Sequence, residues 1–266
     1  MKVNYSYVYL AFFLLLNIFN FVDRNLLIAF APQIKSEFNL TNVQWGLLTG
    51  VYFLFFYSVF GIFMGVLGDK FSRMKIAAAG VFLWSLMTAF TGVAKNFSHL
   101  IVARALIGVG ESALTPNAIS MLSDLFKQNQ RGTASAIYYL GIPLGVGFGM
   151  LIAAFFGPAY GWRSVFITLG LIGMGLGILT YFLLEPRRGQ LDISFDVDNK
   201  STSIRDIISM TKHALYNSRC LTFVIIGSIF LHIPLGAGNF EVLWAVNERG
   251  FTASSYNSLF GIFFIL

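Results

Sequence analysis

The strongest constraint on this chain is a series of long, almost unbroken apolar runs. Seven of them reach about 18 residues or more, the length at which a helix rising 1.5 Å per residue crosses a bilayer core about 30 Å thick. Because the runs are continuous rather than alternating, we expect helices and not strands. Their approximate limits are 7–28, 45–67, 76–93, 100–122, 133–156, 162–184 and 221–245, and an eighth, shorter run covers 253–266.

The composition excludes a water-soluble globule. Hydrophobic residues make up 56% of the chain and charged residues 11%, whereas a soluble domain carries about 25% charged residues. The single cysteine, Cys220, excludes a disulfide framework, and a dispersed net charge of +6 excludes a nucleic-acid-binding surface. The chain has no P-loop, no HExxH motif and no visible nucleophile–base pair, so we expect no cofactor, no bound metal and no enzyme activity.

Basic residues predict the orientation. With the N-terminus in the cytoplasm, twelve of the 18 Lys and Arg residues lie inside and four outside, as the positive-inside rule requires. We therefore expect a multi-pass protein of the inner (plasma) membrane with a cytoplasmic N-terminus. Trp45, Tyr160 and Trp162 then fall at the outer interface, where amphipathic rings prefer to lie.

One long polar stretch interrupts the spans and predicts the division of the chain. Residues 1–184 form a six-span N-terminal half, residues 185–219 a cytoplasmic linker, and residues 220–266 the start of a C-terminal half. Ser203 and Asp206 resemble a helix-capping pair before an amphipathic pattern, so we expect a short surface helix in the linker. The eighth run is too short to cross the bilayer, so we expect a front part of a longer protein.

Ionisable side chains inside the spans are the candidate functional residues. Each costs about 2.5–3.5 kcal/mol at the centre of an inserting helix and therefore needs a partner or a wet cavity. The spacing puts Arg104 and Glu111 on one face of the fourth span, and Asn20 and Arg24 on one polar stripe of the first span. The complete set is Asp23 and Arg24 in the first span, Arg104 and Glu111 in the fourth, and Glu241 in the seventh.

We expect the two polar faces to meet across a cavity, while a buried network that only locks two helices together is the alternative. Asp23, Arg24, Arg104 and Glu111 have no net charge when all are ionised. Protonating either carboxylate would leave a positive site that attracts an anion, which would couple proton uptake to anion binding or release. Glu241 lies near the end of its span and could simply reach the outer interface.

A charged signature follows the second span, in the stretch GVLGDKFSRMK from Gly65 to Lys75. Orientation explains its cations, but it does not explain Asp69, because acidic residues contribute little to topology. A second cluster in the next cytoplasmic loop contains Asp124 and Arg131. Asp124 and Arg73 are expected partners across the inner face.

These motifs resemble the major facilitator superfamily. The loop signature matches except at Ser72, where most members have glycine. The stretches FVDR (21–24), GDKFSR (68–73), GVGE (108–111), GIPLG (141–145) and EPRRG (185–189), together with Arg104, resemble the bacterial spinster-type branch. The resemblance covers essentially the whole chain.

The resemblance implies a twelve-span, alternating-access transporter that is monomeric when complete. In the spinster-type branch the substrates are lysophospholipids or sphingoid lipid phosphates, driven by protons. By resemblance, the positions for substrate and proton coupling are Asp23, Arg24, Arg104, Glu111 and Asn20, and those for the inner gate are Asp69, Arg73, Asp124 and Arg131. A symporter for small organic anions such as sugar acids remains open, and a non-transporting membrane scaffold is a third reading.

Overall fold

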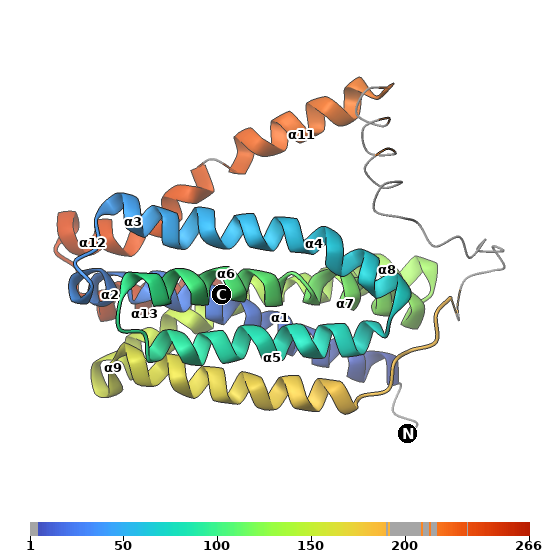
Figure 1. Ribbon diagram of the computed structural model, residues 1–266, viewed down its shortest axis with the longest axis horizontal. Helices are drawn as coiled ribbons and strands as arrows, with labels where there is room; N and C mark the ends of the chain where they lie inside the picture. Colours follow the sequence, from blue (N-terminus) through green and yellow to red (C-terminus); the bar gives the residue numbers. More distant parts are fainter. Residues whose placement is uncertain (1–4, 190, 192–208, 210–212, 214–216, 233) are drawn as a thin grey trace.

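The computed structural model describes residues 5–189, 191, 209, 213, 217–232 and 234–266. All regular elements in these residues are helices, and most lie side by side along the long axis of the molecule (Figure 1). They are α1 (Tyr5–Ala29), α2 (Ala31–Glu37), α3 (Asn42–Gly46), η1 (Leu47–Val51), α4 (Tyr52–Lys70), α5 (Arg73–Gly92), α6 (Phe97–Glu111), α7 (Leu114–Leu125), α8 (Gln128–Tyr139), α9 (Gly141–Phe182), α11 (Arg219–His232), η2 (Pro234–Phe240), α12 (Glu241–Arg249) and α13 (Ala253–Ile265).

Five helical stretches of the described chain are long and apolar enough to cross a membrane. They cover Tyr5–Ala29, Asn42–Lys70, Arg73–Gly92, Phe97–Leu125 and Gln128–Phe182. The last contains the fifth and sixth expected spans, because Gly161 inside α9 has φ 73° and turns the chain between two limbs. A left-handed backbone conformation of this kind is readily available to glycine.

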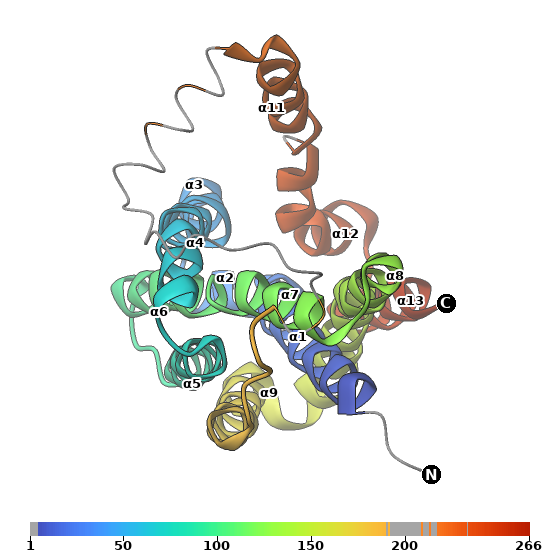
Figure 2. The same ribbon diagram turned by 90° about the vertical axis from the view of Figure 1, so that its right-hand side faces the viewer.

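The seventh expected span is not one continuous helix. It consists of α11, the 3₁₀-helix η2 and α12, and its apolar helical part, Arg219–Ser228, is shorter than a full crossing. α11 stands apart from the main bundle in both views (Figures 1 and 2). The number of spans therefore stays a prediction, and the amphipathic linker helix expected after Ser203 lies outside the described residues.

Polar residues define several helix starts, and small residues set how closely the helices pack. Thr41 and Gln44 form a capping box at α3, and Ser72 and Asn96 cap α5 and α6. In lipid there is little hydrophobic force between helices, so close packing has to come from backbone approach at small residues. A side-chain carbon at Gly145 would lie 2.6 Å from the carbonyl oxygen of Ile18 in α1, which permits only glycine there.

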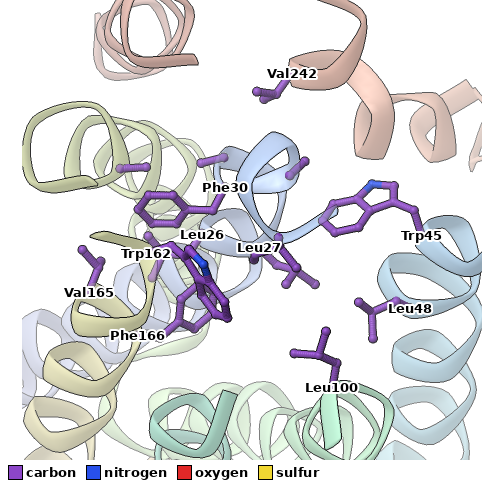
Figure 3. Close-up of a cluster of buried hydrophobic side chains, with 14 of the residues drawn as sticks. Leu26, Leu27, Phe30, Trp45, Leu48, Leu100, Trp162, Val165, Phe166 and Val242 are labelled. Atoms are coloured by element: carbon purple, nitrogen blue, oxygen red, sulfur yellow. The ribbon is translucent and has the colours of Figure 1, made fainter. Parts of the chain in front are cut away.

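Two clusters of buried side chains fill the bundle, one toward each end. The cluster near α2 joins the C-terminal part of α1, the start of α6 and the middle of α9, around its turn at Gly161, to α12 (Figure 3). We call this end of the bundle the α2 end and the opposite end, where α5 begins, the Arg73 end.

Trp45 and Trp162 belong to the cluster at the α2 end, and their expected place at a lipid interface is wrong. Both are buried, at 0% and 6% exposure. Each indole N–H donates its hydrogen bond to a protein acceptor and not to a group at the membrane surface. Trp45 donates to the carbonyl oxygen of Asn239 at 2.9 Å, and Trp162 donates to the Glu37 carboxylate at 2.9 Å.

Candidate functional site

The polar faces of α1 and α6 meet inside the bundle. The Nε atom of Arg24 lies 2.5 Å from the Oε2 atom of Glu111, so the two helices are joined by a charged hydrogen bond. The Glu111 side chain is fully buried, whereas that of Arg24 is 20% exposed. The sequence spacing predicts that these faces oppose each other, and the structure brings them together.

Aromatic rings lie against both arginines of this site. The guanidinium carbon of Arg24 lies 4.7–4.8 Å from the ring centroids of Phe21, Phe53 and Tyr57. That of Arg104 lies 4.4 Å from the ring centroid of Phe53. A cation over an aromatic face is stabilised by the ring quadrupole, by as much as about 2 kcal/mol when it is desolvated. Phe53 in α4 therefore contacts both cations.

Asp23 points away from this pair, toward α5. It accepts a hydrogen bond from the Thr88 hydroxyl at 2.9 Å and is 2% exposed. Asp23 and Arg104 line one cavity of about 10 Å³, together with Thr91 and apolar residues of α1, α6 and α9. This volume holds about one water molecule. Of the four charged residues expected to share a cavity, Asp23 and Arg104 line this small one, whereas Arg24 and Glu111 do not.

Several polar atoms in this region are buried without a hydrogen-bond partner in the described structure. They include Asn20 Nδ2, Asp23 Oδ1, Arg104 Nε and Glu111 Oε1. A buried unpaired polar atom costs about 1–3 kcal/mol, more if it is charged. Atoms of this kind are the ones that a bound ligand, a proton or a water molecule would satisfy. Asn17, by contrast, is used structurally, since its amide donates to the carbonyl oxygen of Tyr138 at 2.8 Å.

A second charged cluster lies at the Arg73 end. Arg73 is 4% exposed, and its NH1 group lies 2.5 Å from the Asp124 carboxylate. It also binds the Ser120 hydroxyl at 3.0 Å, the Glu185 carboxylate at 3.0 Å and the Pro186 carbonyl oxygen at 3.1 Å. The expected partnership of Arg73 and Asp124 is therefore present, and it ties the start of α5 to the end of α7.

The five residues after α9, Glu185 to Gly189, complete this cluster. Arg188 donates to three carbonyl oxygens at the C-terminal end of α4, those of Gly68, Asp69 and Phe71, at 2.5–2.7 Å. A cation at this position complements the helix dipole. The backbone N–H of Gly189 donates to Asp124 at 3.0 Å. Sequence spacing does not identify this role for Arg188, because its partners lie about 120 residues away.

Electrostatics favour the charged form of Glu185. Burial acts to raise the pKa of this carboxyl, but hydrogen bonds from Ser72 and Arg73 and the charge of Arg73 outweigh it, so that the pKa is lowered. The other two residues proposed for this end lie differently. Asp69 is exposed, and its carboxylate forms no ion pair within the described chain. Arg131 donates from Nε to the Phe126 carbonyl oxygen at 3.2 Å.

Comparisons with known proteins all find similarity to transporters of one superfamily. The family model described as Major Facilitator Superfamily matches residues 13–266. Protein spinster of Drosophila melanogaster is 30% identical over 78% of this chain and 35% of its own length. The sphingosine-1-phosphate transporter SPNS2 of Danio rerio is 32% identical over 66% of this chain and 36% of its own length. A probable L-galactonate transporter of Escherichia coli is 29% identical over 64% of this chain and 37% of its own length.

Solved structures agree in fold. A bacterial homolog of the human lysosomal transporter spinster, in an inward-facing and unoccupied conformation, has a TM-score of 0.84 at 24% identity. The alignment covers 98% of this chain and 60% of that one. By contrast, the chain spans about a third of the length of the curated relatives named above.

Proposed function

The chain belongs to the major facilitator superfamily, and from this premise we propose that it acts in proton-coupled secondary transport of an amphipathic or organic anion. A lysophospholipid-like anion is the favoured substrate, and the proposed mechanism is alternating access. The protein is proposed to lie in the inner (plasma) membrane as a monomer with a cytoplasmic N-terminus. The proposed organisation is two halves joined by the linker 185–219.

The observation that carries this proposal is the Arg24–Glu111 pair beside Arg104 and Asp23. Four ionised groups in an apolar bundle are costly, and a structural lock between two helices would need only two of them. Arg24 is the most accessible of the pair, and Glu111 holds it at 2.5 Å. An anion that approaches Arg24 therefore competes with the Glu111 carboxylate for the same guanidinium.

Protonation of Glu111 would settle that competition in favour of the anion. A neutral Glu111 no longer compensates Arg24, so the site gains a net positive charge in a medium of low dielectric. Asp23 is the second candidate proton carrier. Asp23 accepts a hydrogen bond from Thr88 and lines the small cavity together with Arg104. A change in the charge of Asp23 would therefore change the electrostatic energy of Arg104. Asn20 contributes a buried amide next to the Glu111 carboxylate.

The Arg73 cluster is proposed as the inner gate, with Asp69, Asp124 and Arg131 as its other members. Arg73, Asp124 and Glu185 join the ends of α5, α7 and α9 by hydrogen bonds. If the helices move apart at this end, these hydrogen bonds must break and others must form. The cluster would therefore have two discrete arrangements and not a continuous range of them.

The alternative substrate is a small organic anion such as a sugar acid, and the L-galactonate transporter among the relatives favours it. The aromatic surroundings of Arg24 favour an amphipathic substrate instead, since three rings can pack against an acyl chain. A non-transporting scaffold is the least favoured reading.

Uptake by the full-length protein in proteoliposomes tests the proposal. We expect lysophospholipid uptake that rises when a pH gradient is imposed, and little uptake of a sugar acid. Preferential uptake of the sugar acid would support the alternative. If neither compound enters, and neutralising Asp23 or Glu111 harms folding alone, the scaffold reading replaces transport.

A further inference from the structure

Glu241 is a charged residue that the proposed site does not use. It lies in the first turn of α12, directly after the 3₁₀-helix η2. The hydroxyl of Tyr256 in α13 donates to its Oε1 atom at 2.6 Å. Within the described residues, Glu241 forms no ion pair, and its Oε2 atom has no hydrogen-bond partner. Among the described residues, no cation therefore lies within ion-pair distance of this carboxylate.

An open surface pocket of about 430 Å³ lies next to this carboxylate. Its lining consists of Glu241 with Ala237, Gly238, Phe240 and Trp244. The polar part of the lining is thus one carboxylate, and the rest is two aromatic side chains and small residues. The volume lies within the range of small-ligand sites, about 300–1,000 Å³.

Contacts with the N-terminal half hold this region in place. The indole N–H of Trp45 donates to the carbonyl oxygen of Asn239 at 2.9 Å. A side-chain carbon at Gly46 would lie 3.4 Å from the ring of Phe240, so η2 packs directly on the start of the second span. Val242, next to Glu241, is fully buried in the cluster at the α2 end (Figure 3). The two aromatic rings and the carboxylate are thereby presented from a fixed segment.

We propose that Glu241, Phe240 and Trp244 form a binding site for an ammonium group, primary or quaternary. A carboxylate supplies the charge partner, and aromatic faces stabilise a cation by their quadrupoles. The Trp244 ring already carries a cation, because the guanidinium carbon of Arg249 lies 4.8 Å from its centroid. An ammonium group would therefore bind the other face of this ring or displace Arg249. The proposal rests on the proposed transport function in one respect: a lysolipid that carries an ammonium as well as an anionic group is taken as the substrate that would occupy the site.

A purely structural role is the competing explanation. The Tyr256–Glu241 hydrogen bond joins α12 to α13 and would stabilise that corner without any ligand. This role accounts for one carboxylate oxygen only. It does not account for a negative charge left without a cationic partner beside a pocket lined with aromatic rings.

The test compares two lysolipids that differ in the ammonium group. Uptake of lysophosphatidylcholine and of lysophosphatidate is measured in proteoliposomes that hold the full-length protein, for the wild type, Glu241→Gln and Glu248→Gln. Glu248 is the matched control, since it is an exposed glutamate on the same helix. We expect Glu241→Gln to lower lysophosphatidylcholine uptake about tenfold relative to lysophosphatidate, and Glu248→Gln to leave the ratio unchanged. An unchanged ratio in Glu241→Gln overturns the ammonium site while leaving the proposed transport intact.

A second measurement separates this site from transport itself. The melting temperature of the purified full-length protein is followed in tetramethylammonium chloride and in sodium chloride at equal ionic strength. Stabilisation by tetramethylammonium that is lost in Glu241→Gln and kept in Glu248→Gln supports the site even if the wild type carries neither lysolipid. Equal melting temperatures of the wild type in the two salts count against it.

Discussion

Glu111→Gln is the perturbation that most directly probes the charges inside the bundle. It keeps the size of the side chain and removes the charge that lies 2.5 Å from Arg24 Nε. Breaking a buried ion pair by removing one partner costs about 3–5 kcal/mol, because the remaining charge is uncompensated. Arg24 retains partial exposure of 20% and three aromatic rings within 4.8 Å, both of which reduce the penalty. We therefore expect a loss of about 2 kcal/mol in unfolding free energy.

A double-mutant cycle isolates the pair. The unfolding of the full-length protein in detergent is measured for Glu111→Gln, Arg24→Gln and the double variant. If the two side chains stabilise each other, the double variant loses less stability than the two single variants together, by about 1–2 kcal/mol. Glu248→Gln serves as the control at an exposed carboxylate and should change stability by less than about 0.5 kcal/mol.

Additive single effects would refute this reasoning. If the double variant equals the two single variants together within about 0.5 kcal/mol, then Arg24 and Glu111 are energetically independent. The 2.5 Å contact would then contribute nothing that proton coupling could exploit, and the proposed competition between Glu111 and an anion would lose its basis.

Three other predictions concern neighbouring parts of the molecule. Asp23→Asn should fold, because an amide oxygen can still accept the hydrogen bond from Thr88. Uptake by this variant in proteoliposomes should no longer respond to a pH gradient, and a preserved response would exclude Asp23 as the coupling group. Gly145→Val should severely lower the yield of folded protein in size-exclusion chromatography, since a Cβ would lie 2.6 Å from Ile18 O. Gly175→Val is the control, because Gly175 has open space around it. Glu185 has a lowered pKa in the folded state, so its contribution to stability is complete above its ordinary value of 4.5 and is lost as the pH falls below it. As the pH is lowered below this value, the melting temperature of Glu185→Gln should accordingly fall less than that of the wild type. An equal fall in the two proteins would contradict the expectation.

Sequence periodicity predicts the meeting of α1 and α6 because the helix repeat places Arg104 and Glu111 on one face. It does not predict how the charges divide among partners. Arg24 takes Glu111, while its neighbour Asp23 turns toward Thr88 of α5. Adjacent residues on a helix differ by about 100° in direction, so they face different neighbours once the bundle is packed.

The two tryptophans show a limit of composition rules. An amphipathic ring near the end of a span is expected at the lipid interface, yet Trp45 and Trp162 are buried against protein acceptors. Their acceptors, Asn239 and Glu37, lie 194 and 125 residues away. Local hydropathy carries no information about partners at such a distance.

The sequence by itself determined the helical membrane architecture, because apolar runs of bilayer length can satisfy their backbone groups only as helices in this setting. It also determined which charges required an explanation, since each is costly in an apolar span. Only the tertiary structure decided that the cavity between Asp23 and Arg104 is about the size of one water, that the residues after α9 bind the ends of α4, α5 and α7, and that Glu241 lies beside aromatic rings. These features depend on contacts between segments remote in the chain, which packing selects and local pattern does not encode.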